Sequence, residues 1–126
     1  DIARTIASKE RCRIAPTGST ALNALGMTTQ MPANVVYYTD GSPRHIGIGN
    51  GRGLLFKRST DMKRFSYQNE KMQLIVAALR EIGNGKISEV DKKIIVGHLK
   101  VIEEGDYLHD LTLAPAWVQK QLKELR

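Results

Sequence analysis

The chain holds very little of what several classes of protein require. Its 126 residues include one cysteine, Cys12, which excludes an intrachain disulfide, a thiolate zinc site and a CxxC redox pair. The longest apolar runs, such as residues 74–79, are only a few residues long, whereas a helix that crosses a bilayer needs roughly 20. We therefore expect a chain without a membrane span that is suited to the reducing cytoplasm.

Motifs for metal, phosphate or nuclease chemistry are also missing. His45, His98 and His109 are scattered and form no HxxxH or HxE pair that would give a metal two ligands on one face. The glycine-rich residues 47–53 match neither GxGxxG nor GxxxxGK[ST] and lie between expected strands, so we interpret them as a turn. Lys57 lacks the second carboxylate with which a nuclease would hold Mg²⁺. The sequence thus predicts no cofactor, no metal and no catalytic residue.

The composition is that of one small globular domain. A hydrophobic fraction of 41% and a mean hydropathy of -0.31 are typical of a soluble chain with one core. The chain begins with Asp1 and not with methionine, and its opening lacks the long apolar core of a signal peptide. We expect it to be a fragment of a longer protein.

Positive charge is concentrated in the first half of the chain. Nineteen Lys and Arg stand against thirteen Asp and Glu, which gives a net charge of +6. Residues 1–64 hold ten basic and four acidic residues, whereas residues 65–126 hold nine of each. This asymmetry predicts a basic face that attracts phosphates or acidic protein surfaces. The alternative is a set of solvated side chains that only keep the domain soluble.

The first half is expected to form a small antiparallel sheet. Residues 12–15 indicate a short extended segment, and residues 35–39, 44–48 and 54–58 have the β-branched, aromatic and alternating patterns of strands. The Asp-Gly-Ser-Pro cluster at residues 40–43 predicts a hairpin turn between the first two of these strands. Short connections then favour an antiparallel three-stranded meander.

The second half is expected to be helical. Apolar residues at helical spacing predict helices that involve residues 2–7, 21–25, 72–82, 94–102 and 117–125. Ser66 and Ser88 are suited to cap two of these helices, Gly105 to end the second of them, and Pro115 to open the last. The sequence therefore predicts the α+β class, with several helices packed against the sheet.

Two neighbouring tyrosines are expected on opposite faces of the sheet. Because side chains alternate along a strand, one of Tyr37 and Tyr38 belongs to the core and the other to the surface. An exposed tyrosine can stack on a base or anchor a protein partner, although packing at the rim of the core is the simpler role. Cys12 has no histidine near it in the sequence and is interpreted as a small structural residue.

Several short motifs follow one another in a distinctive order. The stretch IAPTGSTALNALGMTTQMPANVVYYTDG at residues 14–41 contains PTG, LG, TTQ-P and TDG, and IGN, FKR and a late APAW follow it. Through these motifs nearly the whole chain resembles the C-terminal region of bacterial AbiEi-type antitoxins and a related family of small bacterial proteins. In such antitoxins an N-terminal winged helix binds operator DNA, and the C-terminal domain counters a nucleotidyltransferase-like toxin. The resemblance implies that the winged helix is missing here and that a toxin protein is the partner.

We predict that residues 1–126 form one non-catalytic domain of an antitoxin or transcriptional regulator. Basic side chains would contact a toxin or the phosphates of DNA, the latter mainly bound through the missing segment. The candidate contact residues are Arg44, Arg52, Lys57, Arg58, Lys63 and Arg64. In the strand that ends this stretch we expect Phe56 in the core and Lys57 exposed. Two alternatives remain open, an enzyme that acts on nucleic acid and a structural or dimerisation domain.

The most distinctive motifs are expected to be structural. Thr17 and Thr20 are suited to cap a helix, and the glycines of the PTG and LG motifs permit unusual backbone angles. A pocket in which Thr28, Thr29 and Gln30 converge would instead indicate ligand binding.

Overall fold

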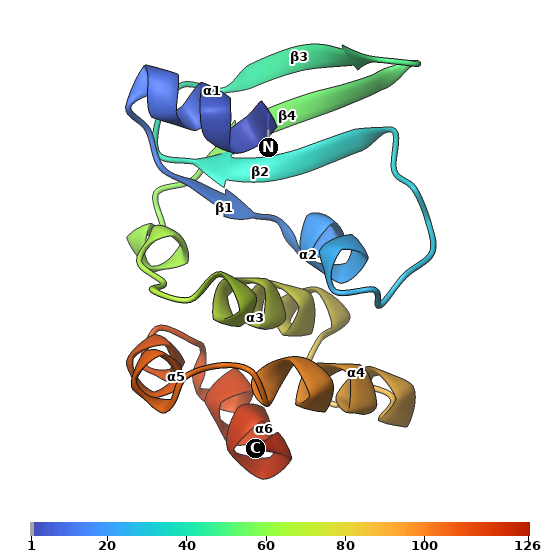
Figure 1. The fold of residues 1–126 in the computed structure, drawn as a ribbon, viewed down its shortest axis with the longest axis vertical. Coiled ribbons are helices and arrows are strands. Elements are labelled where there is room, and N and C mark those ends of the chain that lie inside the picture. Colours follow the sequence, from blue (N-terminus) through green and yellow to red (C-terminus); the bar gives the residue numbers. More distant parts are fainter. Residues whose placement is uncertain (1) are drawn as a thin grey trace.

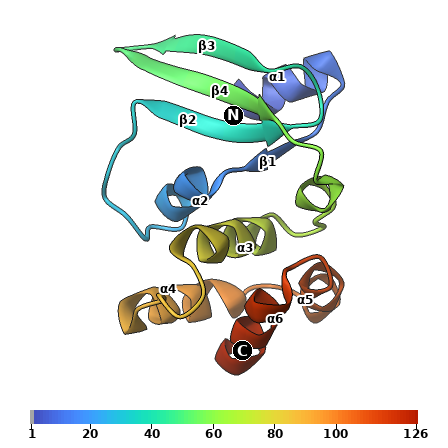
Figure 2. The same cartoon turned by 180° about the vertical axis from the view of Figure 1, so that it is seen from behind.

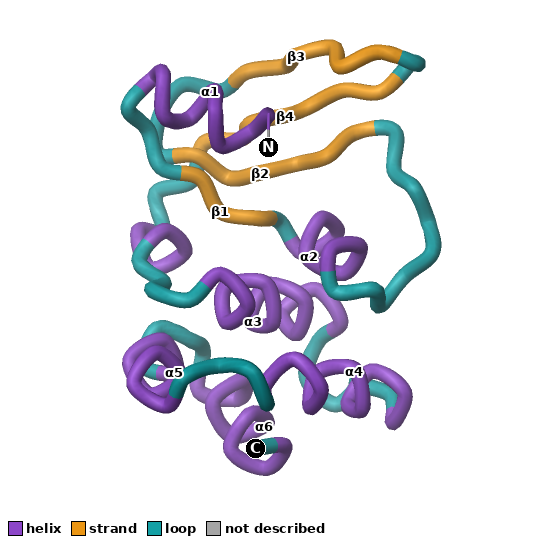
Figure 3. Tube along the Cα trace, in the orientation of Figure 1, coloured by secondary structure: helices purple, strands orange, loops and turns teal. Residues whose placement is uncertain are grey.

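The computed structural model describes residues 2–126 and consists of a four-stranded sheet stacked on a group of helices (Figure 1). The strands are β1 (Ile14–Pro16), β2 (Asn34–Thr39), β3 (Arg44–Gly49) and β4 (Arg52–Arg58). The helices are α1 (Ile2–Glu10), α2 (Gly18–Ala24), the short 3-10 helix η1 (Met62–Phe65), α3 (Glu70–Ile82), α4 (Glu89–Leu99), α5 (Glu104–Leu111) and α6 (Ala116–Leu125). Figure 3 shows the sheet at one end of the molecule and α4, α5 and α6 at the other. The expected α+β class and the helical C-terminal half are confirmed.

The order of the strands differs from the predicted meander. The sheet runs β1-β2-β4-β3, with β1 antiparallel to β2, β2 parallel to β4, and β3 antiparallel to β4. The predicted hairpin between residues 35–39 and 44–48 is therefore wrong, because β2 and β3 are not neighbours. The prediction of three antiparallel strands is wrong as well, because the sheet is mixed and β1 adds a fourth strand.

Two local interactions explain this order. Asn50 and Gly51 have φ angles of 56° and 71°, which a type I′ turn requires, so β3 and β4 close into a tight hairpin. After β2, the Asp40 carboxylate accepts hydrogen bonds from the Arg13 backbone N–H at 2.7 Å and from Arg13 Nε at 2.9 Å. These bonds hold the chain beside the start of β1. It therefore crosses to the outer edge of β4 and does not fold back along β2.

One face of the sheet packs against α1 and forms the smaller of two cores. Ala3 of α1 clusters with Leu54 and Phe56 of β4, and all three side chains are buried. The Tyr37 ring meets Phe56 edge to face, with 6.4 Å between the ring centroids. The predicted helix at residues 2–7 and the core position of Phe56 are both confirmed.

The larger core lies among the helices, with α3 at its centre. Met72, Ile75 and Leu79 are fully buried along one side of α3, as their spacing predicts. The cap of this helix is Asn69 and not Ser66, because the Asn69 side chain accepts a hydrogen bond from the backbone N–H of Met72. The short helix η1, which the sequence did not predict, lies directly before Ser66.

The ends of the later helices follow the sequence signals only in part. Ser88 and Asp91 form a reciprocal capping box at the start of α4, and Pro115 immediately precedes α6, as expected. The expected helix end at Gly105 is wrong, because α4 ends earlier and Gly105 lies inside α5. Acidic side chains in the first turn of α5 favour a helix N-terminus there in spite of the glycine.

The PTG motif completes the edge of the sheet where β1 stops. The Thr17 and Thr20 hydroxyls each donate a hydrogen bond to the Val36 carbonyl at 2.8 Å, and the Val36 N–H donates to the Thr20 hydroxyl at 3.1 Å. Thr17 occupies the N-cap position of α2, but its side chain makes no cap hydrogen bond. These contacts are structural, as expected, although they bind a strand and not the helix.

Asp110 joins α5 to the segment that enters α3. Its side chain is fully buried and accepts hydrogen bonds from the backbone N–H groups of Gln68 and Asn69, both at 2.8 Å. The Nδ1 atom of His109 lies 2.8 Å from the same carboxylate. Such charge-assisted bonds are strong, and leaving their donors unpaired is costly.

We predict that Asp110→Ala lowers the free energy of unfolding by about 2–4 kcal/mol, because two backbone N–H groups lose their acceptor. Asp110→Asn keeps one acceptor oxygen and is expected to lose less. Urea unfolding measures both changes, with the exposed Glu124→Ala as the control, which should stay within about 0.5 kcal/mol of the original protein. A loss below about 1 kcal/mol for Asp110→Ala would contradict this role of the carboxylate.

Candidate binding surface on the open face of the sheet

The face of the sheet opposite α1 carries no helix over β2, β4 and β3 within residues 2–126 (Figure 2). Paired residues of neighbouring strands share a face, so the strand register identifies the side chains on this side. We call this surface the open sheet face. It consists of Asn34, Val36 and Tyr38 from β2, Gly53, Leu55 and Lys57 from β4, and His45 and Gly47 from β3.

Two glycines make the centre of the open sheet face flat. Gly47 and Gly53 are paired directly across β3 and β4. A Cβ atom at Gly53 would meet Asn34 Oδ1 at 2.6 Å and His45 Nε2 at 2.8 Å, so these two side chains lie over Gly53. Nothing lies within 4 Å of a Cβ atom built on Gly47. The two glycines therefore form a floor that is covered at one end and bare at the other.

Tyr38 lies at the other end of the open sheet face, beneath an arginine. The guanidinium carbon of Arg64, from η1, lies 4.3 Å from the centre of the Tyr38 ring. Lys57 is the direct neighbour of Tyr38 on β4 and is exposed, as the alternation of side chains predicts. Tyr37 faces the core under α1 and Tyr38 faces the opposite side of the sheet, as expected. Both side chains are half-buried, so the expectation that one of them is exposed is not met.

Beside Tyr38, a narrow basic cleft separates β1, η1 and α3. Lys63 and Arg64 line it together with Arg80 of α3. The Asp61 carboxylate lies 3.5 Å from Arg64 Nε and 3.9 Å from Arg80 Nη1, so one acidic group serves two arginines. The pattern of the sequence did not single out Arg80, because it lies in the last turn of a helix in the neutral half of the chain.

Tyr67 also lines the basic cleft, and its phenol stays protonated at neutral pH. Burial raises the pKa of Tyr67 to about 12, and this effect outweighs the opposite influence of Arg80. The phenol is therefore not a base for catalysis at neutral pH.

The six basic residues predicted from the sequence do not form one cluster. Lys57, Arg58 and Arg44 line a shallow depression at the end of β4, next to His45. Lys63 and Arg64 lie in the basic cleft. Arg52 is separate from both groups, because it follows the hairpin turn at the far end of β4. Strand register places Arg44 and Arg58 on the α1 side of the sheet, and Arg44 forms an ion pair with Glu10 of α1.

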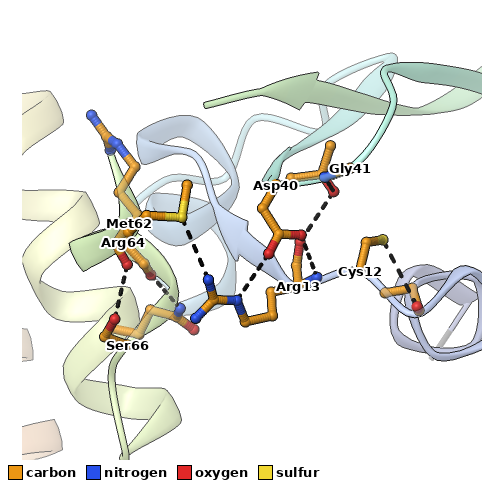
Figure 4. A network of polar contacts seen from close by, with 10 residues as sticks. Cys12, Arg13, Asp40, Gly41, Met62, Arg64 and Ser66 are labelled. Carbon is orange, nitrogen blue, oxygen red and sulfur yellow. Dashed lines mark hydrogen bonds and ion pairs between the residues drawn. The ribbon is translucent and has the colours of Figure 1, made fainter. Parts of the chain in front are cut away.

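Arg13 joins three segments of the chain directly before β1 (Figure 4). Besides its bonds to Asp40, its Nη2 atom donates to the sulfur of Met62 at 3.4 Å, and its guanidinium carbon lies 5.6 Å from the centre of the Phe65 ring. Arg13 therefore holds β1, the crossing after β2 and η1 together. Cys12 is half-buried and its thiol lies 3.8 Å from the Ala7 carbonyl, consistent with the expected structural role.

The TTQ motif does not bring its three side chains together. Thr28 and Gln30 line an open depression between α2 and the loop that leads to β2, but Thr29 does not. The Gln30 N–H donates to the Thr28 hydroxyl at 3.2 Å, which is a local turn contact. The three side chains therefore do not form the pocket that would indicate ligand binding.

Residues 2–126 contain neither a cluster of metal ligands nor a helix that could span a membrane. In this part of the chain, no three His, Cys, Asp or Glu residues are grouped so that they could hold a metal ion. The helices described there are all too short or too polar to cross a membrane.

Comparison with known proteins identifies the family. Residues 1–106 match a family described as a family of unknown function, DUF6088, and the chain belongs to it. No curated protein and no solved structure matches the chain.

We predict that the bond between Asp40 and Arg13 makes stability depend on acid pH. Hydrogen bonds from Arg13 lower the pKa of Asp40 below its ordinary 3.8. The stabilising contribution is therefore complete above the unfolded-state pKa, near pH 4, and is lost as pH falls through the lower pKa of the folded state. Asp40→Asn should accordingly lose less stability than the original protein between about pH 4 and pH 2.

The size of this effect is at most about 1 kcal/mol, because the pair is largely exposed to solvent. Melting temperatures across an acid pH series measure it, with Glu124→Gln as the control. Parallel curves for Asp40→Asn and the original protein would show that this carboxylate is not coupled to folding.

Proposed function

We propose that this domain is the non-catalytic binding part of a bacterial antitoxin or transcriptional regulator. In this proposal it holds an acidic partner through the basic residues around the open sheet face. The resemblance to AbiEi-type antitoxins makes a nucleotidyltransferase-like toxin the first partner to test, and the phosphates of DNA the second. Membership of the DUF6088 family assigns no activity.

One observation supports this proposal most directly. Lys57 and the stacked pair of Tyr38 and Arg64 lie side by side on a face of the sheet that no helix covers within residues 2–126. No carboxylate belongs to the open sheet face, and Asp61 beside it is engaged with two arginines. The surface is therefore available to a partner with the opposite charge.

Aromatic and basic side chains are the groups that binding surfaces commonly use. Tyrosine and arginine are frequent anchors of protein interfaces, because each combines a large apolar area with a polar end. Exposed lysines contribute little to folding but attract acidic partners over about a Debye length. Lys57 and Lys63, which are exposed and form no ion pair within residues 2–126, fit this role better than a role in stability.

The polar groups beneath this surface support binding more than catalysis. The Gln73 amide in the basic cleft donates to the Arg64 carbonyl at 2.8 Å, and the buried Asp110 is committed to backbone N–H groups. A general base needs a free acceptor within reach of the proton that it takes. The Asp110 carboxylate is already used to hold the fold, and the Gln73 amide is too weakly basic to take a proton.

We predict that the double change Lys57→Glu and Lys63→Glu leaves the melting temperature nearly unchanged and lowers the association rate with the acidic partner about tenfold or more. Both lysines are exposed and neither is in an ion pair within residues 2–126. Surface plasmon resonance measures the rate with any nucleotidyltransferase-like protein encoded beside this gene, or with duplex DNA.

The matched control is Lys93→Glu with Lys120→Glu, two exposed lysines in the helical half. It makes the same change in net charge far from the open sheet face. If both double variants slow association equally, only net charge matters and no local binding surface exists. If Lys57→Glu with Lys63→Glu unfolds the domain or leaves binding intact, the proposed surface is wrong.

We also predict that the chain binds duplex DNA weakly and without sequence preference. Contacts from Lys57, Lys63 and Arg64 to one phosphate each would give a slope of about -3 when log affinity is plotted against log salt concentration. A gel-shift titration at several salt concentrations, with unrelated competitor DNA, measures this slope. Sequence-specific binding by these 126 residues would contradict this prediction.

A further inference from the structure

We infer that the open sheet face binds single-stranded RNA, with unpaired bases lying flat on the sheet and phosphates held by lysines at its edge. This inference rests on the proposed function, because it uses the same basic surface. It goes further by naming the ligand and by giving separate roles to Tyr38, His45, Asn34 and the two glycines.

The shape of the surface favours unpaired bases over a duplex. Recognition of duplex DNA in the major groove uses a projecting helix or a two-stranded ribbon. The open sheet face instead has no projecting helix and is bare at Gly47, while Asn34 and His45 lie low over the neighbouring Gly53 and Leu55 is half-buried between Gly53 and Lys57. A planar base can approach such a floor closely, but only when it is not paired in a helix.

Rings at both ends of this floor can stack on bases. The His45 ring of β3 lies over Gly53, and the Tyr38 ring of β2 lies beneath Arg64, with β4 between these two strands. Aromatic rings, imidazoles and guanidinium groups are the usual stacking partners of bases in proteins that bind single strands. The guanidinium of Arg64 extends the stack from Tyr38 to the surface.

Positive charge lies where a strand laid across these rings would place its phosphates. Lys57 lies beside Tyr38 on β4, the strand between those that carry the two rings, and it is exposed. Lys63 is also exposed and lines the basic cleft together with Arg64, which covers Tyr38. A polyanion matches this row of charges, whereas the glycine floor offers an acidic protein few side chains to pack against.

Asn34 and His45 favour RNA over DNA. Their Oδ1 and Nε2 atoms both point over Gly53, and neither makes a hydrogen bond with another group in residues 2–126. A hydroxyl both donates and accepts hydrogen bonds, so it can pair with an amide oxygen and an imidazole nitrogen together. The ribose 2′-hydroxyl is the group that distinguishes RNA from DNA.

Fluorescence anisotropy with labelled oligouridylate of about twelve nucleotides tests the inference directly. We expect binding at low salt that is at least about tenfold tighter than binding of the same oligonucleotide paired with its complement. We also expect oligouridylate to bind several-fold more tightly than oligodeoxyuridylate, and Asn34→Ala to remove that difference. Equal affinity for RNA and DNA single strands would overturn the choice of RNA.

Two variants separate stacking from charge. Tyr38→Ala should weaken oligouridylate binding about tenfold through the loss of one stacking ring. Gly47→Val places a branched side chain on the bare part of the floor, where a Cβ atom meets nothing, and should weaken binding to a similar degree. The matched control is Gly97→Val on α4, because Gly97 is also exposed and open but lies on a helix far from the sheet.

The outcomes distinguish this inference from the proposed function. If Gly47→Val and His45→Ala bind oligouridylate as well as the original protein, bases do not stack on the sheet and the inference is wrong. Loss of all binding in Lys57→Glu with Lys63→Glu would still support the proposed basic surface in that case. If the surface binds the toxin but neither single strand nor duplex, the partner is a protein and only the inference fails.

Circular dichroism confirms that each variant is folded, and Gly47→Val decides the result if Tyr38→Ala does not fold.

Discussion

The bonds between Asp40 and Arg13 direct the chain at the point where the topology of the sheet is decided. At the end of β2 the carboxylate is held by Arg13, directly before β1, and these bonds disfavour a tight turn back along β2. The next two strands pair with each other, and β4 takes the free side of β2 in parallel orientation. This order places Lys57 directly beside Tyr38, which a meander would not do, since β3 would then lie next to β2. The composition of the open sheet face thus depends on one ion pair at its end.

The molecule contains two cores, and polar contacts as well as apolar ones lie between them. Ala3, Leu54 and Phe56 form the small core under α1, while Met72 and its neighbours fill the larger one. The polar contacts include the hydrogen bonds that Thr17 and Thr20 donate to the edge of β2. Polar contacts of this kind are directional, so they fix how the sheet sits on the helices where apolar packing alone would leave freedom. The positions of the open sheet face and the basic cleft relative to each other are fixed for that reason.

Local signals predicted the elements well and their pairing poorly. The spacing of apolar residues located α3, the Ser88 and Asp91 box located the start of α4, and strand alternation separated Phe56 from Lys57. Asp-Gly-Ser-Pro after β2 was indistinguishable from a hairpin turn, because its real partner, Arg13, lies 27 positions earlier. For the same reason the basic residues were predicted as one group, although Arg80 joins Lys63 and Arg64 only through the packing of α3. Strand pairings and side-chain clusters that involve residues distant in sequence could not be predicted from local patterns.

The two edges of the sheet differ in what they offer to another strand. Past the end of β1, the Thr20 hydroxyl already pairs with the backbone N–H and C=O of Val36, so this part of the β2 edge is closed. The outer edge belongs to β3, where a register irregularity between Gly47 and Gly49 interrupts the row of outward N–H and C=O groups. An interrupted edge gives an approaching strand only a short stretch to pair with. The domain can therefore leave a broad sheet surface uncovered without inviting two copies to join their sheets and aggregate.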